Sequence, residues 1–276
     1  MSELELKTPA KINFGLKVIE KRPDGYHNIE TIFYPINLFD HLTFSISRSF
    51  SFISNNLILN NESTNSIIKA KEILELKTGG KFNFTVKLKK NIPIGAGMGG
   101  GSSDGAATLL ALNTLFKLDL SINQLKELAL NIGSDVPFFI HPEPYFASGR
   151  GEVLHPIDFK ISFPILIVNP GIHVFTKWAY QNIKPVKHKI SLLQLLKSSE
   201  VNFKQYKRTI TNDFEKIVFK EFPAIEAIKN SLYKFGASFA LLTGSGSTLF
   251  GIFPDFKSAK NAEEKFSNNY FTFLQH

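Results

Sequence analysis

The chain of 276 residues contains no cysteine, so disulfide bonds and thiolate metal sites are excluded. Its His, Asp and Glu residues show no metal-ligand spacing, and no structural metal is expected. Long apolar runs are also missing, because the longest, such as 164–168, are far too short to span a bilayer. Residues 1–7 lack the basic start and apolar stretch of a signal peptide. These absences favour a cytoplasmic protein without a membrane partner.

Arginine is scarce, and the net charge of +8 comes from lysines spread along the chain. Proteins that bind nucleic acid favour arginine for contacts with bases and phosphates. The composition therefore argues against nucleic acid as the main partner. A basic surface would still attract an anionic substrate such as ATP. The apolar content of 43% is ordinary for a globular protein, and the length suits two domains or one large one.

The most informative segment is Pro93-Ile-Gly-Ala-Gly-Met-Gly-Gly-Gly-Ser-Ser-Asp-Gly-Ala-Ala107. It lies between a predicted strand (82–88) and a predicted helix (104–116), where a flexible linker is seldom found. Glycines allow the backbone to approach a ligand and to turn its N–H groups inward. The helix behind them adds free N–H groups and the positive end of its dipole. This combination predicts a polyphosphate site, and Ser102 and Ser103 also suit helix N-caps.

Better-known nucleotide motifs do not describe this loop. It does not end in Gly-Lys-Ser/Thr, so it is not a Walker A loop. Gly95, Gly97 and Gly100 do spell G-x-G-x-x-G. A dinucleotide fold would require a continuously apolar strand before the motif, whereas residues 82–88 alternate apolar and polar side chains. Protein kinases are excluded because neither His-Arg-Asp nor Asp-Phe-Gly occurs.

Strands followed by helices in each half predict an α+β protein with two domains, 1–158 and 159–276. Strands are expected at 4–20, 29–47, 82–88, around 146 and 153, and at 163–168, 237–243, 248–253 and 270–274. Helices are expected at 65–76, 104–116, 122–131, 175–181, 192–197, 212–219, 224–235 and 257–266. Residues 121–124 form a capping box at the start of the third helix.

The pattern Pro-x-x-x-Gly-x-Gly-Gly-Gly-Ser-Ser resembles the phosphate-binding loop of the GHMP kinases. Further segments resemble the branch of that family that acts on cytidine-diphospho-methylerythritol, in order over nearly the whole chain. Arg-Pro-Asp-Gly-Tyr-His is the element specific to this branch. The segments are Pro9-Ala-Lys-Ile-Asn-Phe-Gly-Leu16, Arg22-Pro-Asp-Gly-Tyr-His27, Ile132-Gly-Ser-Asp-Val-Pro-Phe-Phe139 and Leu242-Thr-Gly-Ser-Gly-Ser247.

The resemblance implies a GHMP kinase fold, with an N-terminal domain like ribosomal protein S5 domain 2 and a ferredoxin-like C-terminal domain. It implies that Asp135 is the catalytic base and that Lys11 favours the ionised aspartate and the developing alkoxide. ATP, accompanied by Mg²⁺, would be held by the loop and by Asn65, for which a helix N-cap is an equally good interpretation. The loop residues are Pro93, Ile94, Gly95, Ala96, Gly97, Met98, Gly99, Gly100, Gly101, Ser102 and Ser103.

The same resemblance implies that Tyr26 stacks on cytosine and that His27 hydrogen-bonds its edge. A second stacking aromatic matches Tyr180, although Phe175 and Trp178 remain alternatives. The other substrate residues implied are Asn13, Thr243, Gly244 and Ser245. Residues 243–247 alone would be interpreted as a hairpin turn.

The expected activity is transfer of the γ-phosphoryl group of ATP to the 2-hydroxyl of 4-(cytidine 5′-diphospho)-2-C-methyl-D-erythritol, in the non-mevalonate route to isoprenoid precursors. Another GHMP kinase, of the homoserine or mevalonate type, is the nearest alternative. A catalytically silent module that binds nucleotides or RNA is the alternative from a different class. Retention of Lys11, Asp135 and the whole loop argues against that module. The protein is expected to act as a monomer or weak homodimer.

Overall fold

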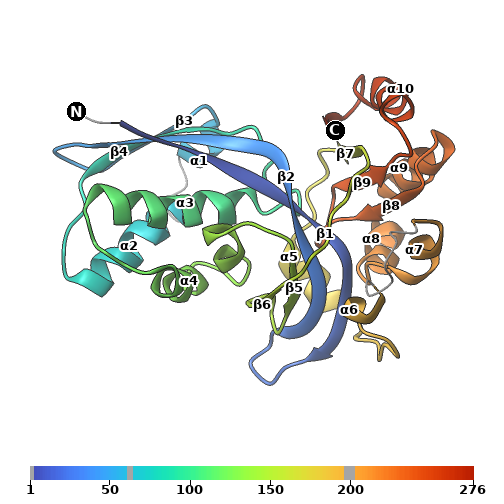
Figure 1. Ribbon diagram of the computed structural model, residues 1–276, viewed down its shortest axis with the longest axis horizontal. Coiled ribbons are helices and arrows are strands. Elements are labelled where there is room, and N and C mark those ends of the chain that lie inside the picture. The colour runs from blue at the N-terminus through green and yellow to red at the C-terminus, as the bar shows by residue number, and fades with distance from the viewer. Residues whose placement is uncertain (1–2, 61–64, 196–202) are drawn as a thin grey trace. The chain divides into compact units, whose positions relative to one another are not determined.

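The computed structural model describes residues 3–60, 65–195 and 203–276. The chain forms two compact units, coloured along the sequence in Figure 1. Unit 1 comprises Met1–Ala10, Asn37–Ile94 and Gly99–Pro142, and unit 2 comprises Lys11–Ile36, Gly95–Met98 and Glu143–His276. Strands β1 (Glu3–Lys21) and β2 (His27–Ile46) contribute residues to both units.

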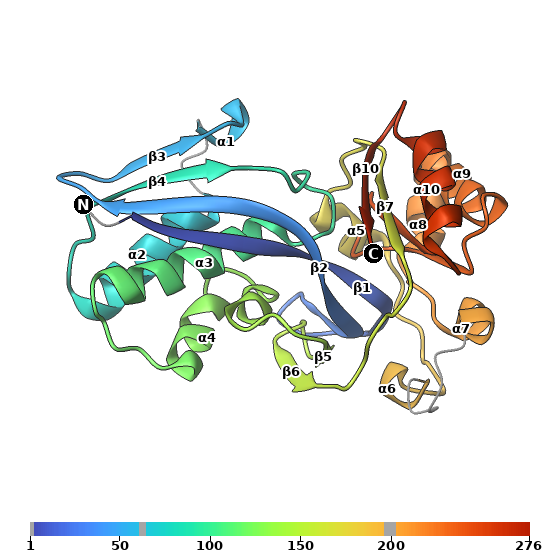
Figure 2. The ribbon, with the colours of Figure 1, turned by 45° about the horizontal axis from the view of Figure 1, so that its top comes forward.

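In unit 1, β4 (Phe84–Lys89) pairs antiparallel with residues 41–46 of β2 and parallel with β3 (Ser51–Ser54). The apolar residues of β4 alternate with polar ones, so that one face is buried and the other carries lysines. Helices α2 and α3 contact each other and lie on one side of these strands (Figure 2). The helices of unit 1 are α1 (Leu57–Asn60), α2 (Ser66–Thr78), α3 (Gly100–Leu115), α4 (Ile122–Leu130) and the 3₁₀ helix η1 (Val136–Ile140).

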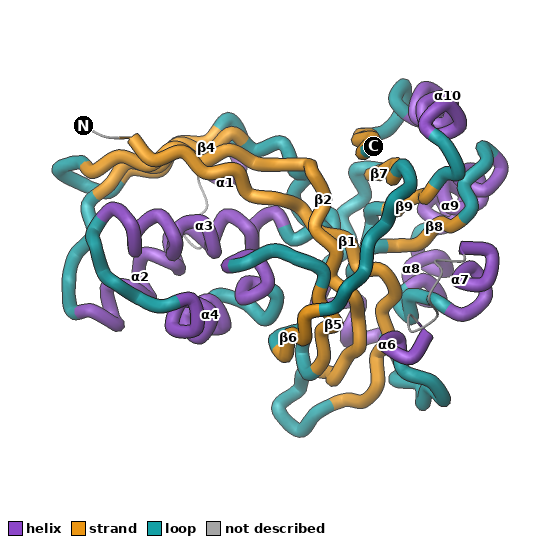
Figure 3. Tube along the Cα trace, viewed as in Figure 1, coloured by secondary structure: helices purple, strands orange, loops and turns teal. Residues whose placement is uncertain are grey.

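Unit 2 contains a four-stranded antiparallel sheet in the order β10-β7-β9-β8. Alternate residues of β8 and β9 face opposite sides. Ala240, Leu242 and Leu249 join the core beneath α8, α9 and α10, whereas Phe239 and Phe250 contact Phe14 in an aromatic cluster. Figure 3 distinguishes these strands and helices by colour. The elements are β7 (Ile165–Asn169), β8 (Phe239–Leu242), β9 (Leu249–Ile252), β10 (Phe271–Gln275), α8 (Glu215–Glu221), α9 (Pro223–Lys234) and α10 (Phe256–Phe266).

The rest of unit 2 includes the turn between β1 and β2 and two short strands beside β2. Arg22 N–H donates to the Tyr26 carbonyl at 2.8 Å and closes this turn. Residues 31–33 of β2 pair with β5, which pairs with β6. The remaining elements are β5 (Tyr145–Ser148), β6 (Val153–Pro156), α5 (Thr176–Asn182), α6 (Leu192–Leu195) and α7 (Phe203–Thr209).

The predicted α+β fold is confirmed, but two helix starts were wrong. Helix α3 begins at Gly100 rather than Asp104, because its burial against α2 outweighs the low helix propensity of glycine. Helix α8 begins at Glu215 rather than residue 212, because the Asn212 side chain accepts the Phe214 N–H in a local turn. Short elements β3, α1, η1 and α7 were not predicted. The last two residues of the predicted helix 192–197 lie outside the described residues.

Candidate functional site

The N-terminus of α3 carries the second part of the glycine loop. Gly99 is its N-cap in the left-handed conformation, with φ 73°, and makes no side-chain cap. Ser102 and Ser103 therefore lie in the first helical turn, and their prediction as N-caps was wrong. Ser102 Oγ instead donates to Asp135 Oδ1 at 2.8 Å. Ser103 Oγ is buried without a hydrogen-bond partner, while the Ser103 N–H donates to the Gly99 carbonyl at 2.9 Å.

The tip of the loop, residues 95–98, belongs to unit 2 and requires glycine at residue 97. Gly97 has φ +76°, and a Cβ there would lie 2.5 Å from the Thr243 carbonyl oxygen. At Gly95, with φ +64°, a Cβ would lie 2.4 Å from the ring of His173. The loop tip and residues 243–247 thus touch through their backbones, which only glycine permits.

Lys11 and Asn13 project from the same face of β1, because side chains two residues apart in a strand point the same way. The Lys11 ammonium donates to Asn13 Oδ1 at 2.6 Å and to the Gly97 carbonyl at 3.2 Å. Asn13 Nδ2 donates to Thr31 Oγ1 at 2.8 Å, and Asn13 N–H donates to Thr243 Oγ1 at 2.9 Å. All of these side chains are buried. The structure therefore connects Lys11, Asn13, the loop tip and Thr243 in one polar network of unit 2.

The loop after β8 is fixed by Asn212, a residue that the sequence did not predict for the site. Buried Asn212 donates from Nδ2 to the carbonyls of Leu242 and Gly244, each at 2.8 Å. The Ser245 hydroxyl lies 3.2 Å from that of Thr176 at the start of α5. The prediction of a hairpin turn is confirmed, since residues 243–248 join β8 to β9. The local turn at Asn212 does not indicate this role, because the two carbonyls that its Nδ2 holds lie 30 residues or more away in the sequence.

The Asp-Gly turn presents an exposed tyrosine and a buried histidine side by side. Tyr26 is 55% exposed, and the Arg150 guanidinium lies 4.8 Å from its ring centroid. His27 is buried and stacks on Tyr180, with ring centroids 5.2 Å apart. Burial, and then the charge of Lys21, lower the pKa of His27, which favours the neutral ring. Its Nδ1 is buried and has no hydrogen-bond partner.

The three candidate aromatics of the second half have different surroundings. Tyr180 is the one that stacks on His27, and its ring also meets Phe214 edge-on at 4.9 Å. Phe175 is largely exposed and contacts His173, whereas Trp178 contacts Phe222. The geometry therefore favours Tyr180 as the aromatic beside His27.

Asn65 caps α2 and keeps one polar group unused. Its Oδ1 accepts from the backbone N–H groups of Ile67 and Ile68, each at 3.0 Å. Its Nδ2 is buried and has no hydrogen-bond partner. A buried donor without a partner is costly, so an acceptor atom of a ligand that reached this amide would supply a hydrogen bond that the described residues do not.

Residues 3–60, 65–195 and 203–276 hold no group of three His, Asp or Glu side chains that could bind a metal ion. Within the same ranges, no helix has the length and apolar character needed to cross a membrane.

Comparison with known families gives two matches along the chain. The model described as GHMP kinases N terminal domain matches residues 65–143, and the model described as GHMP kinases C terminal matches residues 191–272. Among curated proteins, a 4-diphosphocytidyl-2-C-methyl-D-erythritol kinase of Chlorobium phaeobacteroides (strain BS1) is 38% identical over 274 residues, covering 98% of this chain and 96% of the relative. One of Bacteroides fragilis (strain ATCC 25285) is 41% identical over 261 residues, covering 91% and 93%.

Solved structures give the same result. The chain resembles a crystal structure of 4-(cytidine 5'-diphospho)-2C-methyl-D-erythritol kinase, with a TM-score of 0.82, 30% identity and 98% coverage of both chains. The mevalonate kinase of Methanococcus jannaschii has a TM-score of 0.73 at 16% identity, covering 99% of this chain and 98% of its own, and so shares the fold.

Proposed function

Because this chain belongs to the GHMP kinase family, we propose that it transfers the γ-phosphoryl group of ATP to the 2-hydroxyl of 4-(cytidine 5′-diphospho)-2-C-methyl-D-erythritol. This reaction belongs to the non-mevalonate route to isoprenoid precursors. The proposal rests on full-length similarity to enzymes of that name. Within the molecule, the observation that carries it is the pair His27 and Tyr180 beside exposed Tyr26.

The chemistry of His27 suits a pyrimidine base. A neutral imidazole has one donor and one acceptor nitrogen, and the edge of cytosine offers both complements. Nδ1 is buried without a partner, so a ligand group would replace a missing hydrogen bond rather than an existing one. Tyr26 is half exposed and offers aromatic surface for stacking beside the Arg150 guanidinium, and Tyr180 already stacks on His27. Homoserine and mevalonate carry no base and would leave these groups unused.

ATP use follows from the family, because GHMP kinases are ATP-dependent. We assign the adenine contact to Asn65 Nδ2 and the phosphate contacts to the glycine loop with Ser102 and Ser103. Two of the buried polar atoms without partners, Asn65 Nδ2 and Ser103 Oγ, support this assignment. The positive end of α3 would favour the phosphate charge.

We assign Asp135 as the base that takes the proton of the acceptor hydroxyl. The hydrogen bond from Ser102 fixes the orientation of its carboxylate and leaves the second oxygen available. We assign Lys11 to stabilise the negative charge that develops on the acceptor oxygen, together with Asn13, which orients the ammonium.

We further propose that Mg²⁺ accompanies ATP, neutralising phosphate charge during transfer. The hydroxyl of Ser103, buried without a partner, is an oxygen ligand of the kind that Mg²⁺ accepts. Asn13, Tyr26, His27, Tyr180, Thr243, Gly244 and Ser245 would contact the cytidine substrate. We propose that the enzyme acts in the cytoplasm, as a monomer or weak homodimer, on small molecules and not on nucleic acid.

The test is ADP release with three acceptors, namely the cytidine substrate, homoserine and mevalonate. Release of ADP with the cytidine substrate alone supports the proposal, whereas faster release with homoserine or mevalonate contradicts it.

Asp135→Asn is the matched variant, because asparagine keeps the shape of the aspartate side chain and removes the base. It should lose about 10²–10⁴-fold in turnover and keep its affinity for a non-hydrolysable ATP analogue. A variant with turnover near that of the wild type would remove Asp135 from the mechanism.

A further inference from the structure

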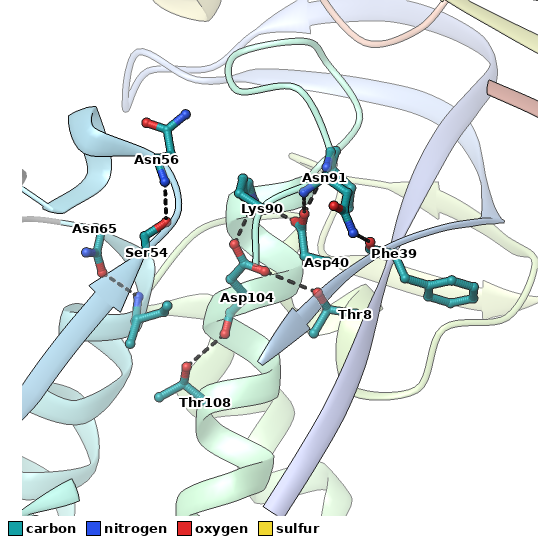
Figure 4. A network of polar contacts seen from close by, with 12 residues as sticks. Thr8, Phe39, Asp40, Ser54, Asn56, Asn65, Lys90, Asn91, Asp104 and Thr108 are labelled. Carbon is teal, nitrogen blue, oxygen red and sulfur yellow. Dashed lines mark hydrogen bonds and ion pairs between the residues drawn. The ribbon is translucent and has the colours of Figure 1, made fainter. Parts of the chain in front are cut away.

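Three buried charges form a cluster in unit 1 at the base of the glycine loop (Figure 4). Lys90, directly after β4, donates to Asp40 of β2 at 2.7 Å and to Asp104 of α3 at 2.6 Å. Their side chains are 6%, 0% and 5% exposed, respectively. Burial of three charges carries a high desolvation cost, so a functional reason for the cluster is worth seeking.

The cluster holds both ends of the loop. At the entry, Asp40 Oδ1 accepts the backbone N–H groups of Asn91 at 2.6 Å and Ile92 at 2.8 Å, immediately before Pro93. At the exit, Asp104 follows Ser103 directly and is bound by Lys90 and, at 3.1 Å, by the hydroxyl of Thr8. Among the side chains drawn in Figure 4, only Lys90 binds both Asp40, at the entry of the loop, and Asp104, at its exit.

The first residue of α3 lies against the same ammonium. A Cβ on Gly100 would lie 3.0 Å from Lys90 Nζ and 2.9 Å from Ile92 Cγ2. Only a residue without a side chain fits beside Lys90 at position 100. The first turn of α3 therefore packs against the cluster. The N–H groups of that turn are the ones assigned to the phosphates.

The cluster contains one ammonium group and two carboxyl groups, so its acidic groups outnumber its basic one. Burial, with the nearby charge of Asp40, raises the pKa of Asp104 to about 7, although Lys90 opposes the rise. Burial alone would lower the pKa of Lys90, but the attraction of the two carboxylates outweighs it and raises the pKa. Lys90 thus stays charged at neutral pH, and its removal would take from two buried carboxyl groups the cation that they share, which would favour protonation of Asp104.

We propose that Lys90 is a positioning residue for ATP, which fixes the entry of the glycine loop to the first turn of α3 through Asp40 and Asp104. This inference rests on the proposed function, because it concerns the phosphate site of that kinase. It predicts that the cluster determines ATP affinity and not only the stability of the fold. The acceptor side of the reaction should be indifferent to it.

Lys90→Met tests the proposal, because methionine fills the space and removes the charge. Hydrogen bonds to charged groups support an expected loss of about tenfold in affinity for a non-hydrolysable ATP analogue. The KM for ATP should rise in parallel, while the KM for the cytidine substrate stays within about twofold of the wild-type value. Titration calorimetry and steady-state kinetics measure the two effects.

Asp104→Asn is the second variant, since it keeps an acceptor oxygen and removes one charge. It decides the question if Lys90→Met fails to fold. We expect a smaller loss, about threefold, because the hydrogen bond becomes a neutral-acceptor one. The double variant should lose no more than Lys90→Met alone, since both changes break the same connection.

Lys229→Met is the matched control in unit 2. Lys229 also binds a largely buried carboxylate, that of Glu215, at 2.6 Å. The Lys229→Met variant should have a lower melting temperature and an unchanged affinity for the ATP analogue. If the two cluster variants lower the melting temperature and leave ATP affinity unchanged, the positioning role is overturned. If the wild-type protein itself binds no ATP analogue, the proposed function fails instead.

Discussion

At the scale of single residues, the structure distinguishes side chains that serve the fold from those left available to ligands. Most buried polar groups of the site have a partner, as Asn13 and Thr243 do. Three buried atoms of predicted site residues do not, and they belong to His27, Asn65 and Ser103. Because an unpaired buried polar atom is costly, their occurrence at predicted contacts supports those assignments.

Gly97→Val should weaken ATP binding sharply. The new Cβ would lie 2.5 Å from the Thr243 carbonyl oxygen, and the positive φ disfavours a β-branched residue. Titration calorimetry with a non-hydrolysable ATP analogue measures the loss. Gly171→Val is the control, because Gly171 has a similar φ, +71°, but nothing lies within 4 Å of its Cβ position. Unchanged affinity in folded Gly97→Val protein would show that the loop does not hold the phosphates.

Tyr26→Ala should raise the KM for the cytidine substrate by roughly tenfold to a hundredfold, the usual value of base–aromatic stacking. The KM for ATP should change little. Tyr180→Ala should produce a loss of the same kind, because Tyr180 also supports the ring of His27. If both rings hold one base, the losses in the double variant should be non-additive.

Trp178→Ala is the control for this pair, since Trp178 contacts Phe222 rather than His27. A loss of ATP affinity in Tyr26→Ala would mean that the base pocket belongs to the other ligand. A silent Tyr180→Ala together with an impaired Trp178→Ala or Phe175→Ala would move the stacking role within α5.

At the scale of elements, the ATP contacts that we assign lie at the starts of two helices. Asn65 begins α2 and the glycine loop begins α3, and the two helices contact each other. Their approach depends on small residues, because a Cβ on Gly105 would lie 2.9 Å from the Cβ of Ser66. The two N-termini that are assigned to the nucleotide are therefore fixed by helix packing within unit 1.

Asn65→Asp separates the two roles of this residue. Aspartate keeps an oxygen for the N–H groups of Ile67 and Ile68, so α2 stays capped. It loses the Nδ2 donor and should raise the KM for ATP at nearly unchanged melting temperature. Asn65→Ala loses both roles and should also cost about 1 kcal/mol of stability. Equal ATP kinetics in Asn65→Asp and wild type would leave Asn65 with a capping role only.

At the scale of the whole molecule, the free energy of unfolding depends on groups that titrate differently in the folded chain. Burial lowers the pKa of His27 below its ordinary value of 6.5. Unfolded His27 therefore binds a proton at a higher pH than folded His27. Its contribution makes the free energy of unfolding fall as pH drops below 6.5, until the folded pKa is reached.

His27→Gln should reduce this loss of stability on the acid side. Above pH 6.5, the difference in free energy of unfolding between His27→Gln and the wild type should not depend on pH. Below pH 6.5, this difference should shift in favour of His27→Gln. Denaturant titrations at several pH values measure the difference. His155→Gln, which removes an exposed histidine, is the control. A difference that is constant over the whole range would contradict a lowered pKa.

The sequence by itself determined the α+β class, most element positions, the glycine loop and the motifs of the family branch. These signals are local: alternation in β4, capping by Asn65 and Ser121, and glycine where φ is positive. Each of these signals depends on interactions between residues a few positions apart, and such neighbours can be read directly from a sequence. The division at residues 158 and 159 stays a prediction.

Only the tertiary structure decided where α3 begins, which aromatic stacks on His27, and which charges meet at Lys90. The partners are far apart in the chain, with Asp40 50 residues from Lys90 and Asn212 30 residues or more from the carbonyls it holds. Burial sets these pairings, because a charge or amide removed from water must find whichever partner the fold brings near. No local pattern records that choice.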